Sequence, residues 1–178
     1  VNRALTGPIN INADHSDSMG ARDTGWIQIY AESNQEVYDN FIQAYPIAEN
    51  EKVHLPVMVC QDGFITSHGV ENILLVEDDK VKAFVGEYEP EHYLLNPNET
   101  MAVGPYAVSN YYMETKRAQR QAMIEAKQVI LDVAKKFEEM TGRKYAFFEE
   151  YRMEDAEYAV VIIGSAAGTC KAAIEHIR

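Results

Sequence analysis

Charged and hydrogen-bonding side chains crowd the stretch from residue 14 to residue 24. They fill eight of its eleven positions: Asp14, His15, Ser16, Asp17, Ser18, Arg22, Asp23 and Thr24. Gly20 and Gly25 add backbone freedom, so the stretch is typical of a polar loop that meets a ligand. The guanidinium of Arg22 suits a small carboxylate, because it offers two parallel donors and stays charged.

Two structural alternatives compete with a ligand-binding role for this loop. Arg22 could form an ion pair with Asp17 or Asp23, as most arginines in acidic loops do. The trio Asp14, His15 and Asp17 has the residue types of a divalent metal site. No second cluster of ligands is visible in the sequence, so we expect these three to form a hydrogen-bonded scaffold that aims Arg22, and we predict no metal site.

A second polar loop carries Asp62, Ser67 and His68, which are residue types used in acyl transfer. The nucleophile elbow Gly-x-Ser-x-Gly is absent, so a hydrolase is disfavoured, and we expect packing around a cofactor cleft or a subunit contact. Asp62 is kept as a possible cleft residue. Thr24 is also a possible cleft residue, although a Thr before Gly is more often a turn residue.

The segments around the two loops must position them. Pro8–Ile11 is predicted as a short β-like run before the first loop, and Trp26–Tyr30 alternates as a half-buried strand does. Ser33 is placed to cap a helix, with Glu36 in the capping-box position. The continuous apolar run Leu55–Cys60 is typical of a strand covered on both faces.

The middle of the chain is predicted to be helical. Pro46 is expected to kink or shorten the helix that Ser33 caps. Asp78 could cap a short helix through Phe84, and a connector broken by prolines follows over residues 86–105. Apolar residues at spacings of three and four predict a long helix over about Tyr106–Met140, with Gly142 placed to end it.

The last part of the chain is predicted as strand, turn and helix. Tyr158–Ile163 forms the strand, Gly164–Gly168 the tight turn, and Thr169–Ile177 the helix, so a new α/β domain opens there. The Gly164–Gly168 turn is a weak phosphate-loop candidate, because it lacks the full dinucleotide spacing. Close packing between strand and helix is the better explanation of its small residues.

Composition limits the class of protein. The chain has 178 residues, 47% of them hydrophobic, which fits one domain and part of another. No run approaches the roughly 18 apolar residues of a membrane helix, so we expect no membrane span. Cys60 and Cys170 form no Cys-x-x-Cys pair, so neither a disulfide framework nor a cluster site is suggested and a cytoplasmic location fits best. The amino end resembles no secretory signal and is expected to be a cut through a longer polypeptide.

The charge is negative and uneven. A net charge of −12 argues against nucleic acid, which needs clustered Lys and Arg. Residues 1–113 hold five basic side chains against seventeen acidic ones, whereas residues 114–144 hold eight against five. Arg22 is therefore isolated in an acidic stretch, and the basic segment is expected to be a solvated helix face or a subunit contact.

The motifs of the chain resemble the thiamine-diphosphate-binding subunit of 2-oxoacid:ferredoxin oxidoreductases, specifically the pyruvate-type members. The motifs are VNRALTGPINI, NADHSDSMGARDTGWIQIYAE, LPVMVCQDGFITSHGVENI, VKAFVGEY and EEYRMEDAEYAVVIIGSAAGT. Together they cover nearly the whole chain. The part NADHSDSMGARDTGW is specific, whereas the last motif taken alone is weak.

The resemblance implies oxidative decarboxylation of pyruvate to acetyl-CoA and CO2 with ferredoxin as electron acceptor, or the reverse synthesis. The arginine that matches Arg22 binds the carboxylate of the 2-oxo acid, and the first loop belongs to the domain that holds the aminopyrimidine of thiamine diphosphate. Mg2+ and [4Fe-4S] clusters are expected in other domains or subunits, with coenzyme A as co-substrate. The carboxylate that activates the aminopyrimidine is expected upstream of Val1, so this segment contains no assigned catalytic residue and should be inactive alone.

The resemblance also implies an α/β fold with two parts. Residues 1–150 would form a thiamine-diphosphate-type pyrimidine-binding domain truncated at its N-terminus, and residues 151–178 would begin a domain similar to the C-terminal domain of transketolase. The implied partners are ferredoxin and the other subunits of a homo- or hetero-oligomer. Ferredoxin is acidic and would be repelled by most of this acidic chain, so its docking surface is expected elsewhere. Two alternatives stay open: another 2-oxo acid (oxalate, 2-oxoglutarate or a branched-chain acid), or a non-catalytic assembly domain of the same fold.

Overall fold

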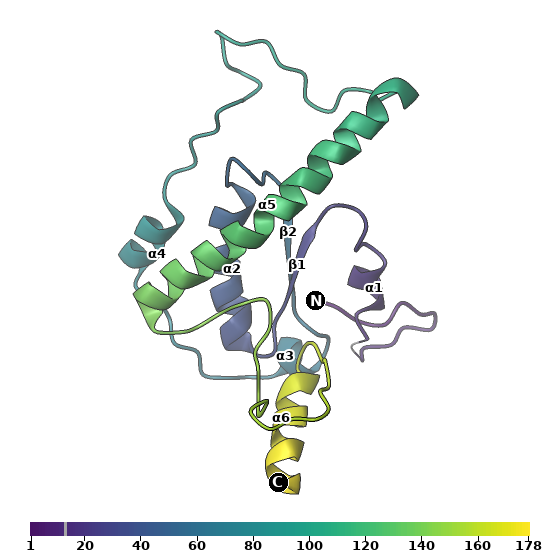
Figure 1. The fold of residues 1–178 in the computed structure, drawn as a ribbon, viewed down its shortest axis with the longest axis vertical. Helices are drawn as coiled ribbons and strands as arrows, with labels where there is room; N and C mark the ends of the chain where they lie inside the picture. The colour runs from purple at the N-terminus through teal and green to yellow at the C-terminus, as the bar shows by residue number, and fades with distance from the viewer. Residues whose placement is uncertain (13) are drawn as a thin grey trace.

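The computed structural model describes residues 1–12 and 14–178, so Ala13 of the NADHSDSMGARDTGW motif lies outside the described residues. The elements run in the order α1 Ser16–Met19, β1 Ile27–Tyr30, α2 Asn34–Ala48, β2 Val57–Cys60, α3 Ile65–His68, α4 Asp78–Val85, α5 Ser109–Thr141 and α6 Ala166–Ile177 (Figure 1). The fold is mixed α/β with a small parallel sheet. None of the helices in the described ranges has the length and apolar character that crossing a bilayer requires.

The sheet consists of β1 and β2, which pair in parallel with Ile27 opposite Val57 and Tyr30 opposite Cys60. Helix α2 connects them, so the three elements form a βαβ unit. Successive side chains of a strand point to opposite faces. In β1, Ile27 and Ile29 therefore lie on one face, and Gln28 and Tyr30 lie on the other. The predicted strands at Trp26–Tyr30 and Leu55–Cys60 are therefore confirmed, each slightly shorter than expected.

Helix α2 begins as its sequence predicts. The Ser33 side chain accepts a hydrogen bond from the Glu36 backbone N–H at 3.3 Å. The Glu36 carboxylate accepts from the Glu32 backbone N–H at 2.7 Å, one residue before the position expected of a capping box. Pro46 lies in the last turn and the helix continues to Ala48, so the proline does not shorten it at position 46.

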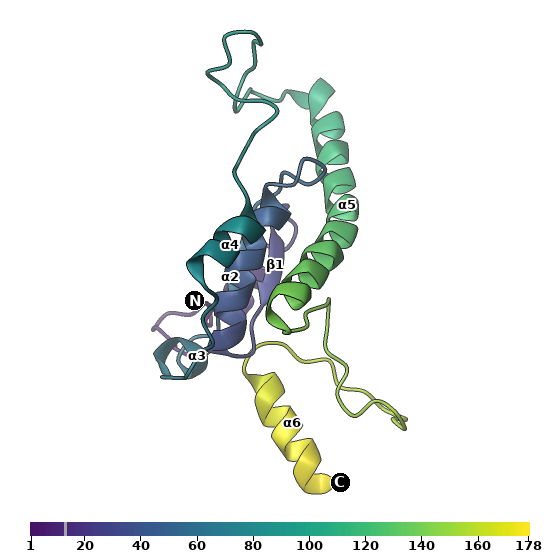
Figure 2. The same cartoon turned by 90° about the vertical axis from the view of Figure 1, so that its left-hand side faces the viewer.

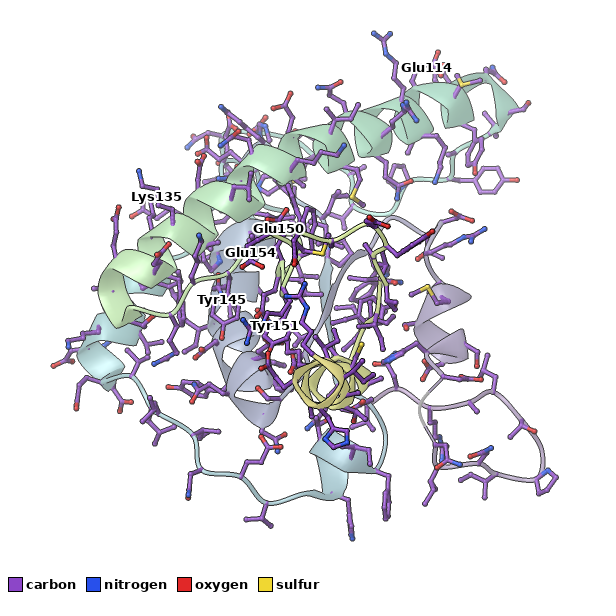
Figure 3. The ribbon with its side chains drawn as sticks, turned by 60° about the horizontal axis from the view of Figure 1, so that its bottom comes forward. Glu114, Lys135, Tyr145, Glu150, Tyr151 and Glu154 are labelled. Atoms are coloured by element: carbon purple, nitrogen blue, oxygen red, sulfur yellow. The ribbon has the colours of Figure 1, made fainter. Side chains whose placement is uncertain are left out.

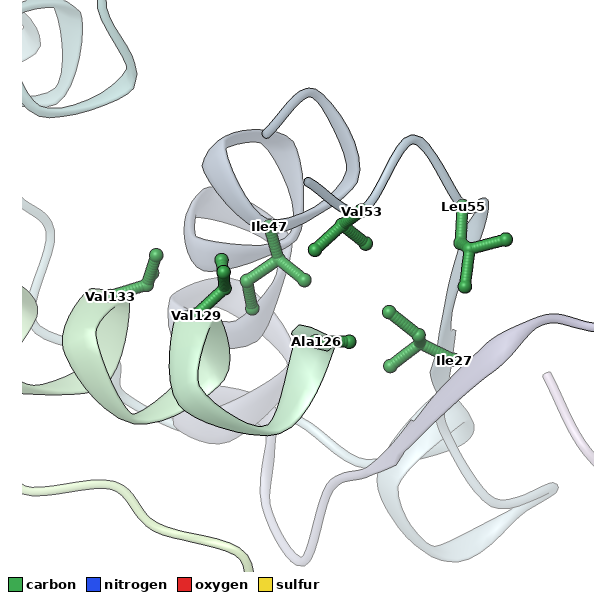
Figure 4. Packing of buried hydrophobic residues seen from close by; sticks show 7 residues of the cluster. All are labelled: Ile27, Ile47, Val53, Leu55, Ala126, Val129 and Val133. Carbon is green, nitrogen blue, oxygen red and sulfur yellow. The ribbon is translucent and has the colours of Figure 1, made fainter. Parts of the chain in front are cut away.

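Helix α5 completes the core. Its apolar stripe packs with α2 and the strand pair in one cluster, consisting of Ile27, Ile47, Val53, Leu55, Ala126, Val129 and Val133 (Figure 4). Full burial of such side chains stabilises a fold by roughly 1.5–3 kcal/mol each. Gly142 ends the helix in the left-handed region at φ 75°, as predicted, and its N–H donates to the Glu138 carbonyl at 2.7 Å.

Other segments lie outside this core. The connector between α4 and α5 contains no helix or strand, as predicted, and it loops out beside the projecting N-terminal part of α5 (Figures 1 and 2). Helix α6 begins near α3 and extends away from the strand pair (Figures 1 and 2).

Two predicted strands are wrong. Pro8–Ile11 and Tyr158–Ile163 are assigned to no strand. A strand needs a hydrogen-bonded neighbour, and the pairing within the described ranges is limited to β1 with β2 and an isolated bridge between Asn2 and Asp62. Tyr158–Ile163 carries the apolar pattern of a buried strand but is exposed here, from 38% at Ile163 to 95% at Val161. The helix that follows is confirmed, but it begins at Ala166, three residues earlier than predicted.

Candidate functional site

The first polar stretch, residues 14–25, is called loop 1. Its acidic residues are occupied by local hydrogen bonds. The Asp14 carboxylate accepts from the Ser16 backbone N–H at 2.9 Å and from the Ser16 hydroxyl at 2.7 Å, and these bonds lower the pKa of Asp14. Asp17 accepts from the Asn2 side chain at 2.9 Å and from the Arg3 backbone N–H at 3.1 Å. Burial opposes ionisation of Asp17, but the hydrogen bonds from Arg3 and Asn2 outweigh it, so its pKa is lowered.

Side chains on the polar face of β1 form hydrogen bonds with loop 1. The Gln28 side chain donates to the Ser18 carbonyl at 2.8 Å, and the hydroxyls of Tyr30 and Ser18 share a hydrogen bond of 2.8 Å. The Tyr30 hydroxyl also donates to the Gln28 side-chain oxygen at 2.8 Å. Burial raises the pKa of Tyr30. Sequence reasoning did not single out Gln28 and Tyr30, although the alternation in Trp26–Tyr30 places both on the face opposite the core.

The other end of loop 1 is fixed against α5. The Thr24 hydroxyl donates to the Ala21 carbonyl at 2.5 Å, as a turn residue does, and the Gln119 side chain donates to the Thr24 carbonyl at 3.1 Å. Gly25 lies at φ 96°, and a Cβ on it would clash with the side-chain amide of Gln119. This contact joins residues 95 positions apart, so nothing in the local sequence indicates Gln119.

Arg22 lies on the outer surface of loop 1. Its Nε is 3.3 Å from Oδ2 of Asp23, and the two side chains are 72% and 87% exposed. Such an exposed pair contributes at most about 1 kcal/mol, so it holds Arg22 weakly. Asp17, the other acid considered as a partner, is bonded to Asn2 and Arg3 instead. Two surface hollows of about 410 and 430 Å³ lie along α2 and α4, and neither is lined by a residue of loop 1.

His15 is a buried residue of the predicted set. Its residue is 7% exposed, its backbone is left-handed at φ 57°, and its ring packs edge-on against Tyr30 with centroids 5.0 Å apart. The ring atom Nδ1 is buried without a hydrogen-bond partner among the described residues. No group of three His, Cys, Asp or Glu side chains able to hold a metal ion occurs within residues 1–12 and 14–178.

Asp62 lies in the second polar loop, residues 61–69, called loop 2. It is 3% exposed, and its carboxylate accepts from the Thr66 hydroxyl at 2.5 Å and from the Ser165 backbone N–H at 2.8 Å. Burial opposes its ionisation, but the bonds from Ser165 and Thr66 outweigh this and lower the pKa of Asp62. Both carboxylate oxygens are therefore engaged by the protein itself.

The other two residues of the acyl-transfer alternative are not joined to Asp62. The Ser67 hydroxyl accepts from the Phe64 backbone N–H at 2.9 Å, and the His68 ring stacks on Phe64 with centroids 5.4 Å apart. Both residues are exposed. Their geometry lacks the nucleophile, base and acid chain of a hydrolase.

The start of α6 faces carboxylates. Asp62 accepts from the Ser165 N–H, and a Cβ on Gly168 would stand 3.1 Å from Oε1 of Glu32. A phosphate group would be repelled there, so the phosphate-loop interpretation of Gly164–Gly168 is disfavoured. Ion pairs hold the rest of the helix: Lys171 reaches Glu32 at 2.7 Å.

The polar segment of residues 149–157, called the hinge, precedes α6 and is bonded to it. Arg152 donates two hydrogen bonds to Glu175 at 2.7 and 2.8 Å, and the Tyr151 hydroxyl donates a third at 2.6 Å. These bonds, with that of Arg152 the strongest cause, lower the pKa of Glu175 to about 2. Figure 3 shows Tyr151 beside α6, with Glu150 and Glu154 close by in the hinge.

Sequence comparison places this arrangement in a family. The profile of a family described as pyruvate flavodoxin/ferredoxin oxidoreductase, thiamine diphosphate-binding, matches residues 1–135. The chain is similar to pyruvate synthase subunit PorA of Thermotoga maritima, with 53% identity over 178 residues, and to PorA of Methanocaldococcus jannaschii, with 49% identity over 179. It is 38% identical to ketoisovalerate oxidoreductase subunit VorA of Pyrococcus abyssi over 179 residues.

These matches cover 100%, 99% and 100% of this chain but 45%, 46% and 45% of the respective relatives, so the chain spans about half the length of the curated relatives it matches. The match to the family profile includes loop 1, β1, loop 2 and most of α5. The motif resemblance is thereby confirmed: the chain belongs to the thiamine-diphosphate-binding family of pyruvate flavodoxin/ferredoxin oxidoreductases.

Proposed function

We propose that the chain is part of an enzyme that oxidatively decarboxylates pyruvate to acetyl-CoA and CO2 with ferredoxin as electron acceptor, or catalyses the reverse synthesis. The observation that carries this proposal is the identity of about half of all residues, along the whole chain, with two subunits named pyruvate synthase. Identity with the ketoisovalerate oxidoreductase subunit is lower, at 38%, which favours pyruvate over a branched-chain 2-oxo acid.

Arg22 is the proposed substrate-binding residue of the segment. Its guanidinium is exposed and held by one weak ion pair, so a substrate carboxylate could replace Asp23 as its partner at small cost. The acids of loop 1 that could otherwise compete, Asp14 and Asp17, are occupied by their own hydrogen bonds. This arrangement supports a role in orienting a small organic acid.

The described residues suit the substrate side of a thiamine diphosphate site, not its diphosphate side. Arg22 offers a cation to a carboxylate, whereas the described part of the chain has no cluster of acids for Mg2+. We assign Mg2+, the diphosphate, the [4Fe-4S] clusters and the coenzyme A site to other parts of the complete protein or its partners. When bound, thiamine diphosphate supplies the electron sink for decarboxylation.

Arg22 would then act by position and charge. Its two terminal nitrogens would hold the substrate carboxylate in one orientation, and the positive charge would offset the repulsion between that carboxylate and the acidic surroundings. Its role would be to bind and orient the substrate, without transferring a proton.

The domain proposal follows the same resemblance. Residues 1–150 would form the pyrimidine-binding domain, and residues 151–178 would begin a transketolase C-terminal-like domain. The exposed apolar segment Tyr158–Ile163 supports the second part, since its side chains have the pattern of a strand that is buried between neighbours. The relatives are named as subunits, which supports assembly with further subunits.

The test is an assay of the full-length protein purified with its partners. We expect pyruvate and coenzyme A together to drive reduction of ferredoxin or a viologen dye. The same assay with 2-oxoglutarate, oxalate and a branched-chain 2-oxo acid identifies the preferred substrate. If the complex reduces ferredoxin with another 2-oxo acid but not with pyruvate, the assignment of pyruvate as the substrate is wrong. If activity persists in a complex that lacks this chain, a non-catalytic assembly role is favoured.

A further inference from the structure

We propose that Asp62 is a positioning residue that couples the docking of helix α6 to the conformation of loop 1, and through it to Arg22. Asp62 is 3% exposed, and its carboxylate accepts a hydrogen bond from the backbone N–H of Ser165 at 2.8 Å, immediately before the first turn of α6. The two residues are 103 positions apart. A hydrogen bond to a buried carboxylate is among the stronger ones in proteins, so the start of α6 is fixed to loop 2.

Asn2 connects loop 2 to loop 1. Its backbone N–H donates to the Gln61 carbonyl and its carbonyl accepts from the Gly63 N–H, both at 2.6 Å. Asn2 is therefore hydrogen-bonded to the residues on both sides of Asp62. Its side-chain amide donates to Asp17 of loop 1 at 2.9 Å. Asn2 is itself 5% exposed. A continuous chain of hydrogen bonds therefore runs from Ser165 through loop 2 and Asn2 to Asp17.

A second connection runs through His15. A Cβ on Gly164 would stand 2.8 Å from Nε2 of His15 and 3.3 Å from Oδ2 of Asp62, so the turn before α6 lies against both loops. Nδ1 of His15 is buried without a partner in the described part of the chain. Packing between Tyr30 and Gly164 therefore helps to hold the His15 side chain in place.

Backbone hydrogen bonds within loop 1 connect the segment that holds His15 and Asp17 to Arg22. Consecutive backbone bonds join Gly20 to Ser16 at 3.0 Å, Ala21 to Ser18 at 2.9 Å and Arg22 to Met19 at 3.3 Å. The α1 turn and the residues after it therefore form one bonded unit that includes Arg22. A shift of α6 that moves His15 and Asp17 would move this unit, so docking of α6 sets where the guanidinium lies.

The first test compares Asp62→Ala with Asp62→Asn in the full-length protein purified with its partners. Hydrogen–deuterium exchange should rise in Asp62→Ala both around Ser165 and in residues 15–22, which belong to a different part of the sequence. Asp62→Asn should stay near wild type, because its amide oxygen can still accept from Ser165 while its NH2 group donates to the Thr66 hydroxyl. Faster exchange around Ser165 alone, with residues 15–22 unchanged, would refute the coupling.

Two further variants separate coupling from a general loss of fold. Gly164→Ala should disturb loop 1 through His15, with Asp62 itself retained. The added Cβ would press on the His15 ring, and the φ of 72° at Gly164 strains any side chain. Asp155→Asn is the matched control: it removes an exposed ion pair with Arg178, the residue after α6, and Asp155 has no bond to loop 1 within the described residues. If Asp62→Ala does not fold, unchanged exchange at residues 15–22 in Gly164→Ala still refutes the proposal.

The catalytic consequence rests on the proposed function and is measured separately. Asp62→Ala should raise the KM for pyruvate at least about fivefold, with a smaller effect on kcat, as expected for a misplaced binding group. Asp155→Asn should leave KM unchanged, and an equal increase in both variants would overturn the specific role of Asp62. Should the complex not use pyruvate, the exchange experiment still decides whether the coupling exists.

Discussion

Arg143 donates two hydrogen bonds to the carboxylate of Asp39, Nε to Oδ2 at 2.6 Å and Nη2 to Oδ1 at 2.8 Å. Asp39 lies in the middle of α2 and is fully buried, whereas Arg143 follows the last turn of α5. The Tyr145 hydroxyl adds a third bond to Asp39 at 2.6 Å. The end of the long helix is thereby fastened to the helix that joins the two strands. The hydrogen bond to Asp39 raises the pKa of Arg143, and burial, followed by its bond to Asp39, raises that of Tyr145.

Asp39→Ala should reduce the free energy of unfolding by about 3 kcal/mol, because it leaves Arg143 and Tyr145 without their acceptor. Urea unfolding of the purified protein measures the loss. Asp23→Asn is the control, since it breaks an exposed pair with Arg22 and should change stability by no more than about 0.5 kcal/mol. Equal effects of the two substitutions would show that the buried network contributes no more than a surface pair.

Arg22→Leu in the complete enzyme should lower kcat/KM for pyruvate at least about tenfold, given roughly 1.5–3 kcal/mol for a charged hydrogen bond. Steady-state kinetics with pyruvate as the varied substrate measures the change. Arg3→Leu removes a positive charge from the segment that flanks loop 1, while leaving the Arg3 backbone bond to Asp17 intact. If Arg3→Leu and Arg22→Leu have the same kinetics, the effect is one of general charge and the specific role of Arg22 is wrong.

Helices were predicted better than strands because their periodicity is local. The stripe through Ala126, Val129 and Val133 indicates both the length of α5 and its buried face, and Gly142 indicates its end. Strands depend on partners that a single segment does not reveal. Tyr158–Ile163 has the composition of a strand, yet it belongs to no strand in the described part of the chain and is exposed.

The polar character of loop 1 was predictable, but the residues that hold it were not. Asn2, Gln28 and Gln119 contact it from three different segments, and only Gln28 has a local signal, which is its place on the polar face of β1. Asp62 was chosen for its residue type and remains a predicted cleft residue. Its bond to Ser165 could not be anticipated, because it depends on how α6 folds back toward the loops.

Asp17→Asn should make the protein less stable at neutral pH, by about 1 kcal/mol for the weakened bonds from Asn2 and Arg3. The pKa of Asp17 is lowered below its ordinary value of 3.8 in the folded state. Its contribution is therefore complete above pH 3.8 and is lost as the pH falls through the lower folded-state value. Urea unfolding at a series of pH values should show the gap between wild type and variant closing below pH 3.8. A gap that is constant across that range would mean that ionisation of Asp17 does not stabilise the loop.

Gly25→Ala should destabilise the protein by about 2 kcal/mol or more. Gly25 has φ 96°, which disfavours any side chain, and an added Cβ would displace the Gln119 side chain that donates to Thr24. Gly7→Ala is the matched control, because no atom lies within 4 Å of its added Cβ, and it should be close to neutral. Adding Gln119→Ala to Gly25→Ala should relieve the clash but not the backbone strain, so recovery should be partial. Full recovery of the free energy of unfolding would assign the whole effect to Gln119, whereas no recovery would assign it to the backbone of Gly25 alone.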